Sequence, residues 1–198
     1  MNNGNGLRVV LWLSGCSHKC KGCQNPQTWD ANSGIQFDEL AKEEIFRELD
    51  KDYISGLTLT GGDPLFEGNL NGVLDLVTEV NKRYNTIQYI DENLQENYNI
   101  LNGNADKIRL SCPKKSIWMY TGYAWEDLVK YEYGATYVNN INVDALRQAV
   151  ISQCDAIIDG RYIDSQRDIT LPYRGSANQR LIDVRKSLQK GEIVLWKC

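Results

Sequence analysis

The sequence predicts an α/β fold in which helices pack around a parallel sheet. Residues 7–13 form an apolar run of strand length, and the apolar positions of 37–49 then follow a helical spacing. Residues 56–60 read as a second short strand, followed by another helical stripe over 70–84. Alternation of strand and helix is typical of βα units. Because no repeat or break in composition divides the 198 residues, we expect a single domain over 1–198.

The other elements follow from local composition. Residues 1–6 are polar and rich in glycine, which predicts a loose lead-in. Residues 85–116 carry many asparagines, which favour turns, so we expect an elaborated connection there, with one short strand near 107–110. The remaining predicted elements are a strand at 117–120, helices at about 125–131 and 143–152, a strand at 156–158, an irregular stretch at 172–179 and a last strand at 193–196.

Charge and hydropathy exclude several classes of protein. The chain has 22 Lys and Arg against 26 Asp and Glu, a net charge of −4, and no long basic run. This balance gives no electrostatic reason to expect nucleic acid or a membrane surface as a partner. The apolar stretch 9–13 is far too short to span a bilayer, and no secretory cleavage pattern follows it. We therefore expect a cytoplasmic protein.

Three of the six cysteines lie close together. Cys16, Cys20 and Cys23 have the spacing C-x3-C-x2-C, whereas Cys112, Cys154 and Cys198 stand alone. Without a secretory signal, clustered thiols favour metal or redox chemistry over a disulfide framework. The cluster directly follows the first predicted strand, at the end where α/β sheets place their ligands.

Three thiolates on one short loop suit iron–sulfur clusters or zinc. A structural zinc site usually takes four protein ligands in two separated pairs, and the chain has no second pair. A 4Fe–4S cluster held by three cysteines keeps one iron open to a substrate or cosubstrate. Zinc with His18 or Cys112 as the fourth ligand, and plain core thiols, remain as alternatives. We assign no catalytic role to His18, the only histidine.

A second candidate site follows the strand at 56–60. Gly61 and Gly62 allow close approach of the backbone to a ligand, and Asp63 is an acceptor suited to a cationic amino group. A plain turn is the alternative interpretation. Because the loops after the first two strands would be adjacent, a cofactor could be anchored by both.

Together these motifs resemble the radical S-adenosylmethionine superfamily, which combines C-x3-C-x2-C with Gly-Gly-Asp or Gly-Gly-Glu. Most members carry an aromatic residue before the third cysteine. The Gly22 found here agrees with one family, the activating enzymes of anaerobic ribonucleoside-triphosphate reductases. The resemblance runs in order from about Leu7 to Val184 through Ser14-Gly15-Cys16, Gly22-Cys23-Gln24-Asn25, Thr28-Trp29, Gly56 to Pro64, Tyr120-Thr121-Gly122-Tyr123, Asp159-Gly160-Arg161-Tyr162 and Arg174 to Gln179.

The resemblance implies a truncated, partial parallel βα barrel, a 4Fe–4S cluster with one open iron, and S-adenosylmethionine as cosubstrate. It implies Cys16, Cys20 and Cys23 as cluster ligands, and Gly61, Gly62 and Asp63 as the residues that hold the amino end of the cosubstrate. Further cosubstrate contacts would come from Gly22, Cys23, Gln24, Thr121 and Asp159. The segment from Arg174 to Gln179 would either cap the sheet or contact the partner or the cosubstrate.

The activity implied is reductive cleavage of S-adenosylmethionine to place a glycyl radical on the anaerobic ribonucleoside-triphosphate reductase. A low-potential donor such as flavodoxin or ferredoxin would supply the electron. The open cluster would be sensitive to oxygen, which implies anaerobic conditions. The alternatives are an activase resembling that of pyruvate formate-lyase, and a zinc- or cluster-binding interaction module without enzymatic activity.

Overall fold

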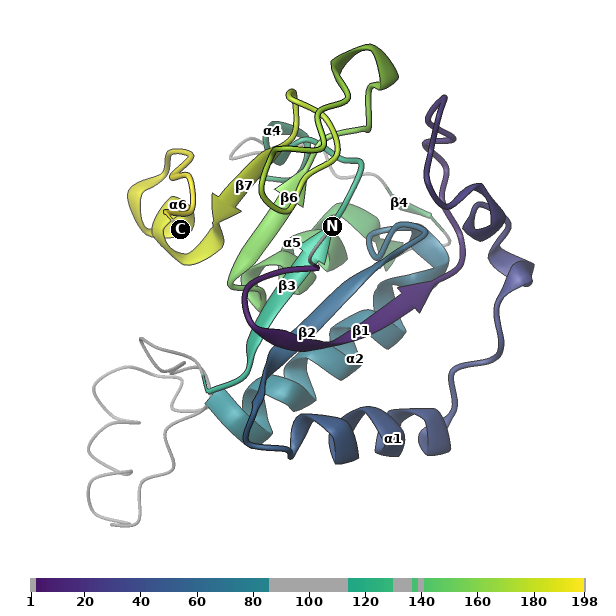
Figure 1. The fold of residues 1–198 in the computed structure, drawn as a ribbon. Coiled ribbons are helices and arrows are strands. Elements are labelled where there is room, and N and C mark those ends of the chain that lie inside the picture. Colours follow the sequence, from purple (N-terminus) through teal and green to yellow (C-terminus); the bar gives the residue numbers. More distant parts are fainter. Residues whose placement is uncertain (1–2, 86–113, 130–136, 139–140, 198) are drawn as a thin grey trace.

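The computed structural model describes residues 3–85, 114–129, 137–138 and 141–197. Its centre is a five-stranded sheet in the order β1-β2-β3-β6-β7 (Figure 1). The first four of these strands run parallel, and β7 is antiparallel to β6. The strands are β1 Leu7–Leu13, β2 Ile54–Gly61, β3 Ser116–Tyr120, β6 Ala156–Asp159 and β7 Arg180–Asp183.

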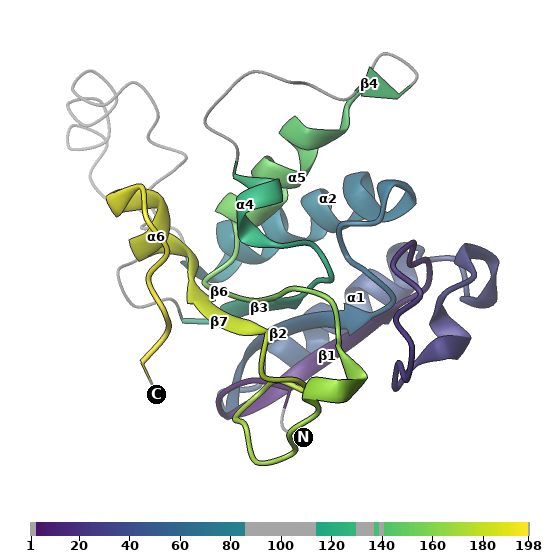
Figure 2. The same cartoon turned by 90° about the horizontal axis from the view of Figure 1, so that it is seen from above.

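Helices cover one face of this sheet. Figure 2 shows them on one side of the strands, whereas the segment between β6 and β7 lies on the other side with the amino-terminal residues. The helices are α1 Glu39–Leu49, α2 Leu70–Val80, α4 Trp125–Leu128, α5 Val143–Ser152 and α6 Val184–Lys190, and a π-helical turn, η4 Asn81–Asn85, extends α2. The predicted α/β class with a mostly parallel sheet is confirmed.

The main core lies between the sheet and the helices. Leu59 pairs in register with Met119, and Met119 pairs with Ile157, so these side chains point to one face. All three are fully buried in a single cluster with Phe46 and Leu49 of α1. The apolar runs of β2, β3 and β6 are therefore strands buried on the helix side. The run at 7–13 differs, because β1 is an edge strand with no fully buried residue, so the burial on both faces that its pattern predicts is wrong.

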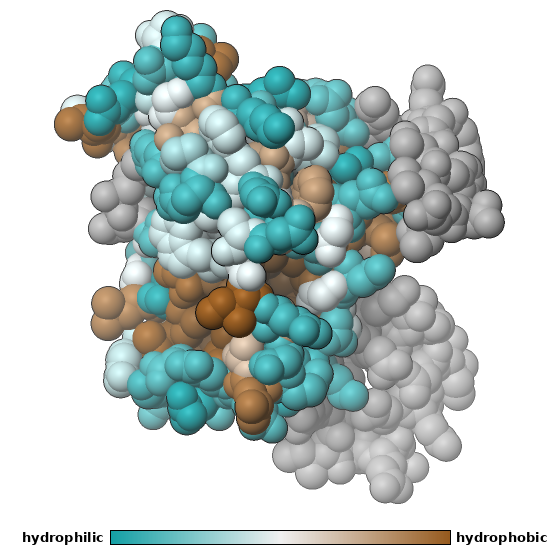
Figure 3. Space-filling view, turned by 90° about the vertical axis from the view of Figure 1, so that its right-hand side faces the viewer, coloured by the Kyte–Doolittle hydropathy of each residue, from teal (hydrophilic) through white to brown (hydrophobic). Residues whose placement is uncertain are grey.

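The helical stripe predicted over 37–49 is wrong at its start. The Asp38 side chain accepts a hydrogen bond from the Ala41 N–H and caps the helix, so Phe37 lies outside it. Phe37 and Leu40 are 41% and 74% exposed, and the neighbouring Ile35 is fully exposed. Figure 3, which views the side of the molecule where this segment runs, shows apolar side chains gathered among hydrophilic ones.

The opposite face of the sheet is closed by the amino-terminal residues. Gly4 is buried, and the Asn3 carbonyl accepts a hydrogen bond from Thr58 Oγ1 at 2.6 Å. The prediction of a loose lead-in is therefore wrong for these residues. Beside them, a smaller buried cluster is built around Trp118, with Ala156, Ile158 and Leu181.

Arg8 fills the space between this cluster and the amino-terminal residues. Its guanidinium donates to the carbonyl oxygens of Leu57 and Ser116, at 2.6 Å each, and to the Thr58 hydroxyl at 2.7 Å. The group also lies 5.4 Å from the centroid of the Trp118 ring. Burial lowers the pKa of Arg8 to about 10.

The carboxyl-terminal part differs from the prediction. Neither β7 nor α6 was predicted, and the strand expected at 193–196 does not form. Gly191, in a left-handed conformation, ends α6 and lets the chain turn back along β7. Only Leu195 then pairs with Ile182, as an isolated antiparallel bridge. The polar ends of β7 and the short length of both elements explain why the sequence pattern missed them.

Several expectations concern residues outside the described ranges. These are the elaborated connection with its strand near 107–110 and two of the isolated cysteines, Cys112 and Cys198. The helix predicted over 125–131 is too long, since α4 ends at Leu128 and the Val129 backbone is not helical. A short antiparallel pair that was not predicted, β4 Tyr137–Val138 with β5 Ile141–Asn142, precedes α5. Within the described ranges, no helix has the length and apolar character needed to cross a bilayer.

Candidate functional site

The carboxyl ends of the four parallel strands meet at one edge of the sheet, and a cavity of about 320 Å³ opens there. Loops from all four strands contribute to its lining. Most of the residues predicted for the site line this cavity, namely Cys16, Cys20, Cys23, Gln24, Gly61, Gly62, Asp63 and Thr121. Gly22 and Asp159 do not line it.

The cysteine loop is tied to itself and to the sheet by backbone hydrogen bonds. The Gly15 N–H donates to the Thr28 carbonyl at 2.8 Å, and the Cys16 N–H donates to the Trp29 carbonyl at 3.1 Å. These bonds draw the two ends of the loop together. The Cys23 N–H donates to the Cys20 carbonyl, which makes a tight turn with Gly22 in a left-handed conformation (φ 75°). Gly22 therefore shapes the loop.

The three cysteines are free thiols, each half-buried. Burial raises the pKa of Cys16 and Cys20, although nearby backbone N–H groups partly oppose the shift. The Asn25 N–H points at Cys23 Sγ at 3.4 Å, a donor that favours a negatively charged sulfur. Such thiols become thiolates when a metal is bound.

The donor set fits an iron–sulfur cluster better than a single metal ion. In the described part of the chain, no three Cys, His, Asp or Glu side chains converge closely enough to hold one ion. The three thiols instead lie around one cavity. A cubane is bound through separate iron atoms, so its ligands need not share a single point. The zinc alternative that uses Cys112 concerns a residue outside the described ranges.

The Gly61-Gly62 pair is explained by close packing between strand ends. A Cβ on Gly62 would lie 2.5 Å from the Gly15 carbonyl oxygen, and Gly61 has a left-handed φ of 98°. The Gly62 N–H donates to the Leu13 carbonyl at 2.7 Å. The glycines therefore bring β2 against the start of the cysteine loop, and they also leave the cavity wall free of side chains.

Asp63 is almost completely buried, at 2% exposure, and its carboxylate accepts hydrogen bonds from protein groups. The donors are the Leu65 N–H at 2.9 Å, the Gly122 N–H at 2.9 Å and the Thr121 hydroxyl at 3.0 Å. Asp63 thus joins the end of β2 to the end of β3. The sequence predicted an acceptor for a ligand, whereas the structure shows an acceptor already engaged with three donors.

His18 connects the cysteine loop to this carboxylate. Its Nε2 lies 2.9 Å from Asp63 Oδ2, a close contact without the alignment of a hydrogen bond, and its side chain is 5% exposed. The ring packs edge-on against Tyr123, with centroids 4.6 Å apart. A Cβ on Gly122 would lie only 2.3 Å from the ring, so Gly122 makes room for it. The histidine therefore anchors the loop.

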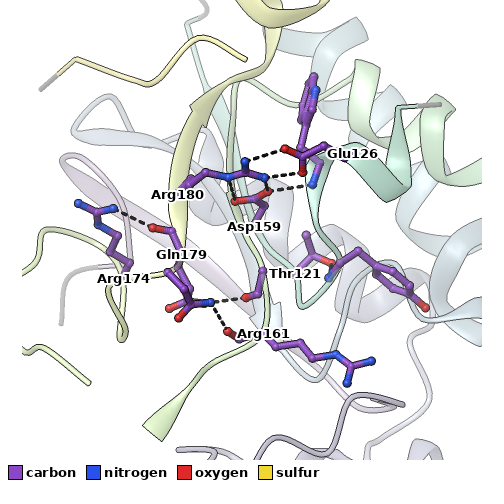
Figure 4. A network of polar contacts seen from close by, with 11 residues as sticks. Thr121, Glu126, Asp159, Arg161, Arg174, Gln179 and Arg180 are labelled. Carbon is purple, nitrogen blue, oxygen red and sulfur yellow. Dashed lines mark hydrogen bonds and ion pairs between the residues drawn. The ribbon is translucent and has the colours of Figure 1, made fainter. Parts of the chain in front are cut away.

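Asp159 lies behind the cavity, in an ionic network shown in Figure 4. Its carboxylate is 1% exposed and accepts from the Trp125 N–H at 2.8 Å and from the Arg180 guanidinium. Arg180 also donates to both oxygens of Glu126, at 2.8 Å each. This network braces β6, β7 and α4, and it does not bring Asp159 to the cavity.

Another wall of the cavity comes from the segment 174–179. The Gln179 side chain, labelled in Figure 4, donates to the Gly160 carbonyl at 3.0 Å. It also accepts from the Gly175 and Ser176 N–H groups. The Arg174 guanidinium donates to the Gln179 carbonyl at 2.7 Å. Because Gly175 and Gln179 both line the cavity, this segment forms one of its walls.

Comparisons with known proteins bear on this site. The family model described as "4Fe-4S single cluster domain" matches residues 2–91 and 91–182. The chain is 33% identical to the anaerobic ribonucleoside-triphosphate reductase-activating protein of Haemophilus influenzae, over 89% of this chain and 88% of that protein. The proteins of the same name from Vibrio cholerae and Enterobacteria phage T4 are 33% and 36% identical, over 89% and 90% of this chain and 88% and 85% of their own. No solved structure matches.

The chain belongs to the family of anaerobic ribonucleoside-triphosphate reductase-activating proteins. This membership confirms the resemblance that the sequence motifs indicated. The match to the family model also confirms a 4Fe–4S single cluster domain.

For this activating protein, sequence reasoning missed several residues that line the cavity. Tyr162 lies in a motif that carried the resemblance, so its signal was present without an assigned role, whereas Gln179 lies in the segment expected to cap the sheet or to contact the partner or the cosubstrate. Two other cavity residues had no local signal, because Asn3 was assigned to the lead-in and Trp12 to an ordinary strand. Their position at the cavity follows from how the chain folds, which a local motif does not report.

Proposed function

We propose that this protein binds a 4Fe–4S cluster through Cys16, Cys20 and Cys23 and uses S-adenosylmethionine to generate a glycyl radical on an anaerobic ribonucleoside-triphosphate reductase. The observation that carries the proposal is the shared cavity. Three free thiols from one loop face strand ends that lack side chains at Gly61 and Gly62. Such a cavity offers thiols for a cluster and exposed backbone for a cosubstrate.

When bound and reduced, the cluster would supply the electron that breaks a C–S bond of S-adenosylmethionine, releasing methionine and a 5′-deoxyadenosyl radical that takes a hydrogen atom from a glycine. The protein binds and orients the reacting groups and excludes water. Gly61 and Gly62 would receive the amino-acid end of the cosubstrate at the open backbone. Trp12 and Tyr162, which line the same cavity, offer aromatic surface to its adenine.

Asp63 takes a different part in this proposal from the one expected from sequence. Because protein donors already engage its carboxylate, it would act by orienting Thr121 and by holding His18 and the cysteine loop. Asp159 would act only as a brace behind the wall. Gly22 would shape the cysteine loop, while Gln24 remains a candidate for direct contact.

The proposed architecture is a partial barrel. The sheet ends at β1 on one side and at β7 on the other. In the truncated barrel that we propose, the gap between these edges would admit a loop of the reductase. A low-potential protein such as flavodoxin or ferredoxin would supply the electron, and the whole chain would act as one radical S-adenosylmethionine domain.

Anaerobic reconstitution tests the function. We expect a brown protein with about four iron atoms per chain that, once reduced, converts S-adenosylmethionine to 5′-deoxyadenosine. With a cognate reductase, electron paramagnetic resonance should show a glycyl radical. Cys16→Ala, Cys20→Ala and Cys23→Ala should each abolish cleavage, whereas Cys154→Ala, at a core cysteine away from the cavity, should keep the cluster.

The two halves of the proposal fail separately. If all three loop variants still cleave S-adenosylmethionine, the cluster assignment is wrong. If cleavage proceeds but the reductase acquires no radical, the substrate assignment is wrong and the cluster assignment stands.

A further inference from the structure

A second cavity of about 370 Å³ lies beside the cysteine cavity. The two share Gly122 and Gly160, which lie just past the ends of β3 and β6. At these two positions the boundary between the cavities therefore consists of backbone alone. The second cavity is also lined by Ala124, Arg161 and Asn178. Its size lies within the range of ligand-binding pockets.

Two polar groups in this second cavity are available to a ligand. Arg161 is exposed, and no carboxylate in the described ranges forms an ion pair with its guanidinium. Asn178 donates through Nδ2 to the Arg161 carbonyl at 2.8 Å, but its Oδ1 is buried and accepts no hydrogen bond from any described residue. A buried acceptor without a donor is costly, so a ligand that supplies an N–H would be favoured there.

Of the other charged groups in the lining, Asp159 and Arg180 pair with each other, whereas Asp127 is exposed and forms no ion pair in the described ranges. Arg180 is held between Asp159 and Glu126, which leaves Arg161 as the cation facing the cavity (Figure 4). A ligand that suits the site therefore presents an acceptor to a guanidinium and a donor to an amide oxygen. A peptide unit has both, as its C=O and its N–H. A small anion would leave Asn178 Oδ1 without a donor. A cation, although attracted by Asp127, would leave the Arg161 guanidinium without an acceptor, whereas a peptide unit satisfies both Arg161 and Asn178.

We propose that the second cavity binds an extended peptide segment of the polypeptide on which the protein acts, next to the glycine presented to the cysteine cavity. The inference rests on the proposed function, because it assumes a polypeptide substrate. Beyond the proposed function, the inference says where the backbone on either side of that glycine is held, and it names Arg161 and Asn178 as the residues that bind it.

The sharpest test reverses the charge at one position and compares it with a matched control. Arg161→Glu removes the donor facing the cavity. Arg167→Glu makes the same charge change at another exposed arginine, six residues further along and outside both cavities. Ala124→Leu adds bulk to the lining and leaves both polar groups in place.

Each reconstituted variant would be measured for iron content, for S-adenosylmethionine cleavage without reductase, and for glycyl radical yield as the cognate reductase is titrated. We expect Arg161→Glu and Ala124→Leu to raise the reductase concentration for half-maximal yield about tenfold, as for a central binding residue. Iron content and cleavage without reductase should be unchanged in Ala124→Leu, which alters no charge; this requirement is not placed on Arg161→Glu, because the Arg161 charge acts on Cys20. Arg167→Glu should change the half-maximal concentration by less than about twofold, since exposed charges contribute little.

Direct binding of the reductase to immobilised protein keeps this test separate from the proposed chemistry. If the wild-type protein makes no radical, the proposed function fails, while a selective loss of binding in Arg161→Glu and Ala124→Leu still supports the cavity. Equal binding by all variants overturns the inference. So does an Arg161→Glu variant whose main defect is a higher KM for S-adenosylmethionine, because Arg161 would then contact the cosubstrate.

Discussion

Asp63 and Asp159 occupy similar places but differ in what they hold. Each lies at the carboxyl end of a parallel strand, β2 or β6, and each carboxylate is almost completely buried. Asp63 accepts from uncharged donors in the loop that follows β3, and it contacts His18. Asp159 is paired with a cation, Arg180, and stays behind the cavity.

The comparison shows that position after a strand does not decide the role of a buried carboxylate. The neighbouring elements decide it. At β2 the neighbour is the cysteine loop, so the carboxylate joins two parts of the functional cavity. At β6 the neighbour is the antiparallel strand β7, which brings Arg180 alongside and makes the carboxylate a brace.

The largest expected effect comes from Asp63→Ala. Removing this acceptor leaves buried donors on Leu65, Thr121 and Gly122 and releases His18. We expect the free energy of unfolding of the metal-free protein to fall by about 3 kcal/mol in urea titrations. We also expect iron affinity to fall by about tenfold, as for other residues that orient metal ligands. An iron affinity equal to that of the wild type would contradict the link between Asp63 and the cysteine loop.

Asp159→Ala should have a smaller and purely structural effect. It leaves Arg180 without its buried partner, but that side chain is 32% exposed and keeps Glu126. We therefore expect a loss of about 2 to 3 kcal/mol in the free energy of unfolding. Iron content at saturation should match the wild type. A variant that folds but does not take up iron would erase the distinction between the two aspartates.

Two glycines sharpen the same contrast. Gly122→Ala would push a Cβ to 2.3 Å from the His18 ring, so we expect a loss of about 2 kcal/mol and weaker iron binding. In Gly160→Ala the new Cβ would meet no close neighbour, since the nearest group, Asn178, lies 3.7 Å away. The only free-energy cost is then that of holding an alanine at the left-handed φ of 90°. Its expected cost is about 1 kcal/mol with normal iron content. Thermal unfolding with parallel iron assays separates the two.

The smallest effect concerns the exposed end of the Arg180 network. Hydrogen bonds from Arg180 lower the pKa of Glu126 to about 2 from an ordinary value of 4.5. The ion pair therefore stabilises the fold above pH 4.5, and this contribution is lost as the pH falls toward 2. Because Glu126 is 60% exposed, Glu126→Gln should cost less than about 1 kcal/mol at neutral pH. Urea titrations of the metal-free protein across this pH range should converge for variant and wild type at the acid end.

The sequence predicted those parts of the molecule that local pattern determines. Apolar runs predicted β1, β2, β3 and β6, and the cysteine spacing predicted the loop that lines the cavity. Pattern failed where pairing is distant in sequence. Arg180 contacts Asp159, which lies 21 residues earlier in the chain. The strand β7 has only two apolar residues, Leu181 and Ile182, which are too few to give a strand pattern.

Prediction of individual roles was limited for the same reason. Asp63 and Asp159 both follow a strand, and nothing in their own segments reveals that one meets His18 and the other a guanidinium. The lead-in appeared loose because its residues are polar. In the structure, Gly4 is buried against Arg8 and Trp118, so closely that a Cβ there would lie 2.7 Å from Arg8 Cδ.

Arg8 explains why the cavity opens at only one end of the strands. Its guanidinium occupies the interior near the amino ends of the strands, bonding carbonyls of two neighbouring strands where a wider sheet would need further layers of side chains. The Arg8 side chain thus fills the space near the amino ends of the strands, and the cavity lies toward their carboxyl ends. A lysine has no planar fork to reach both carbonyls, so this position would tolerate even that conservative exchange poorly.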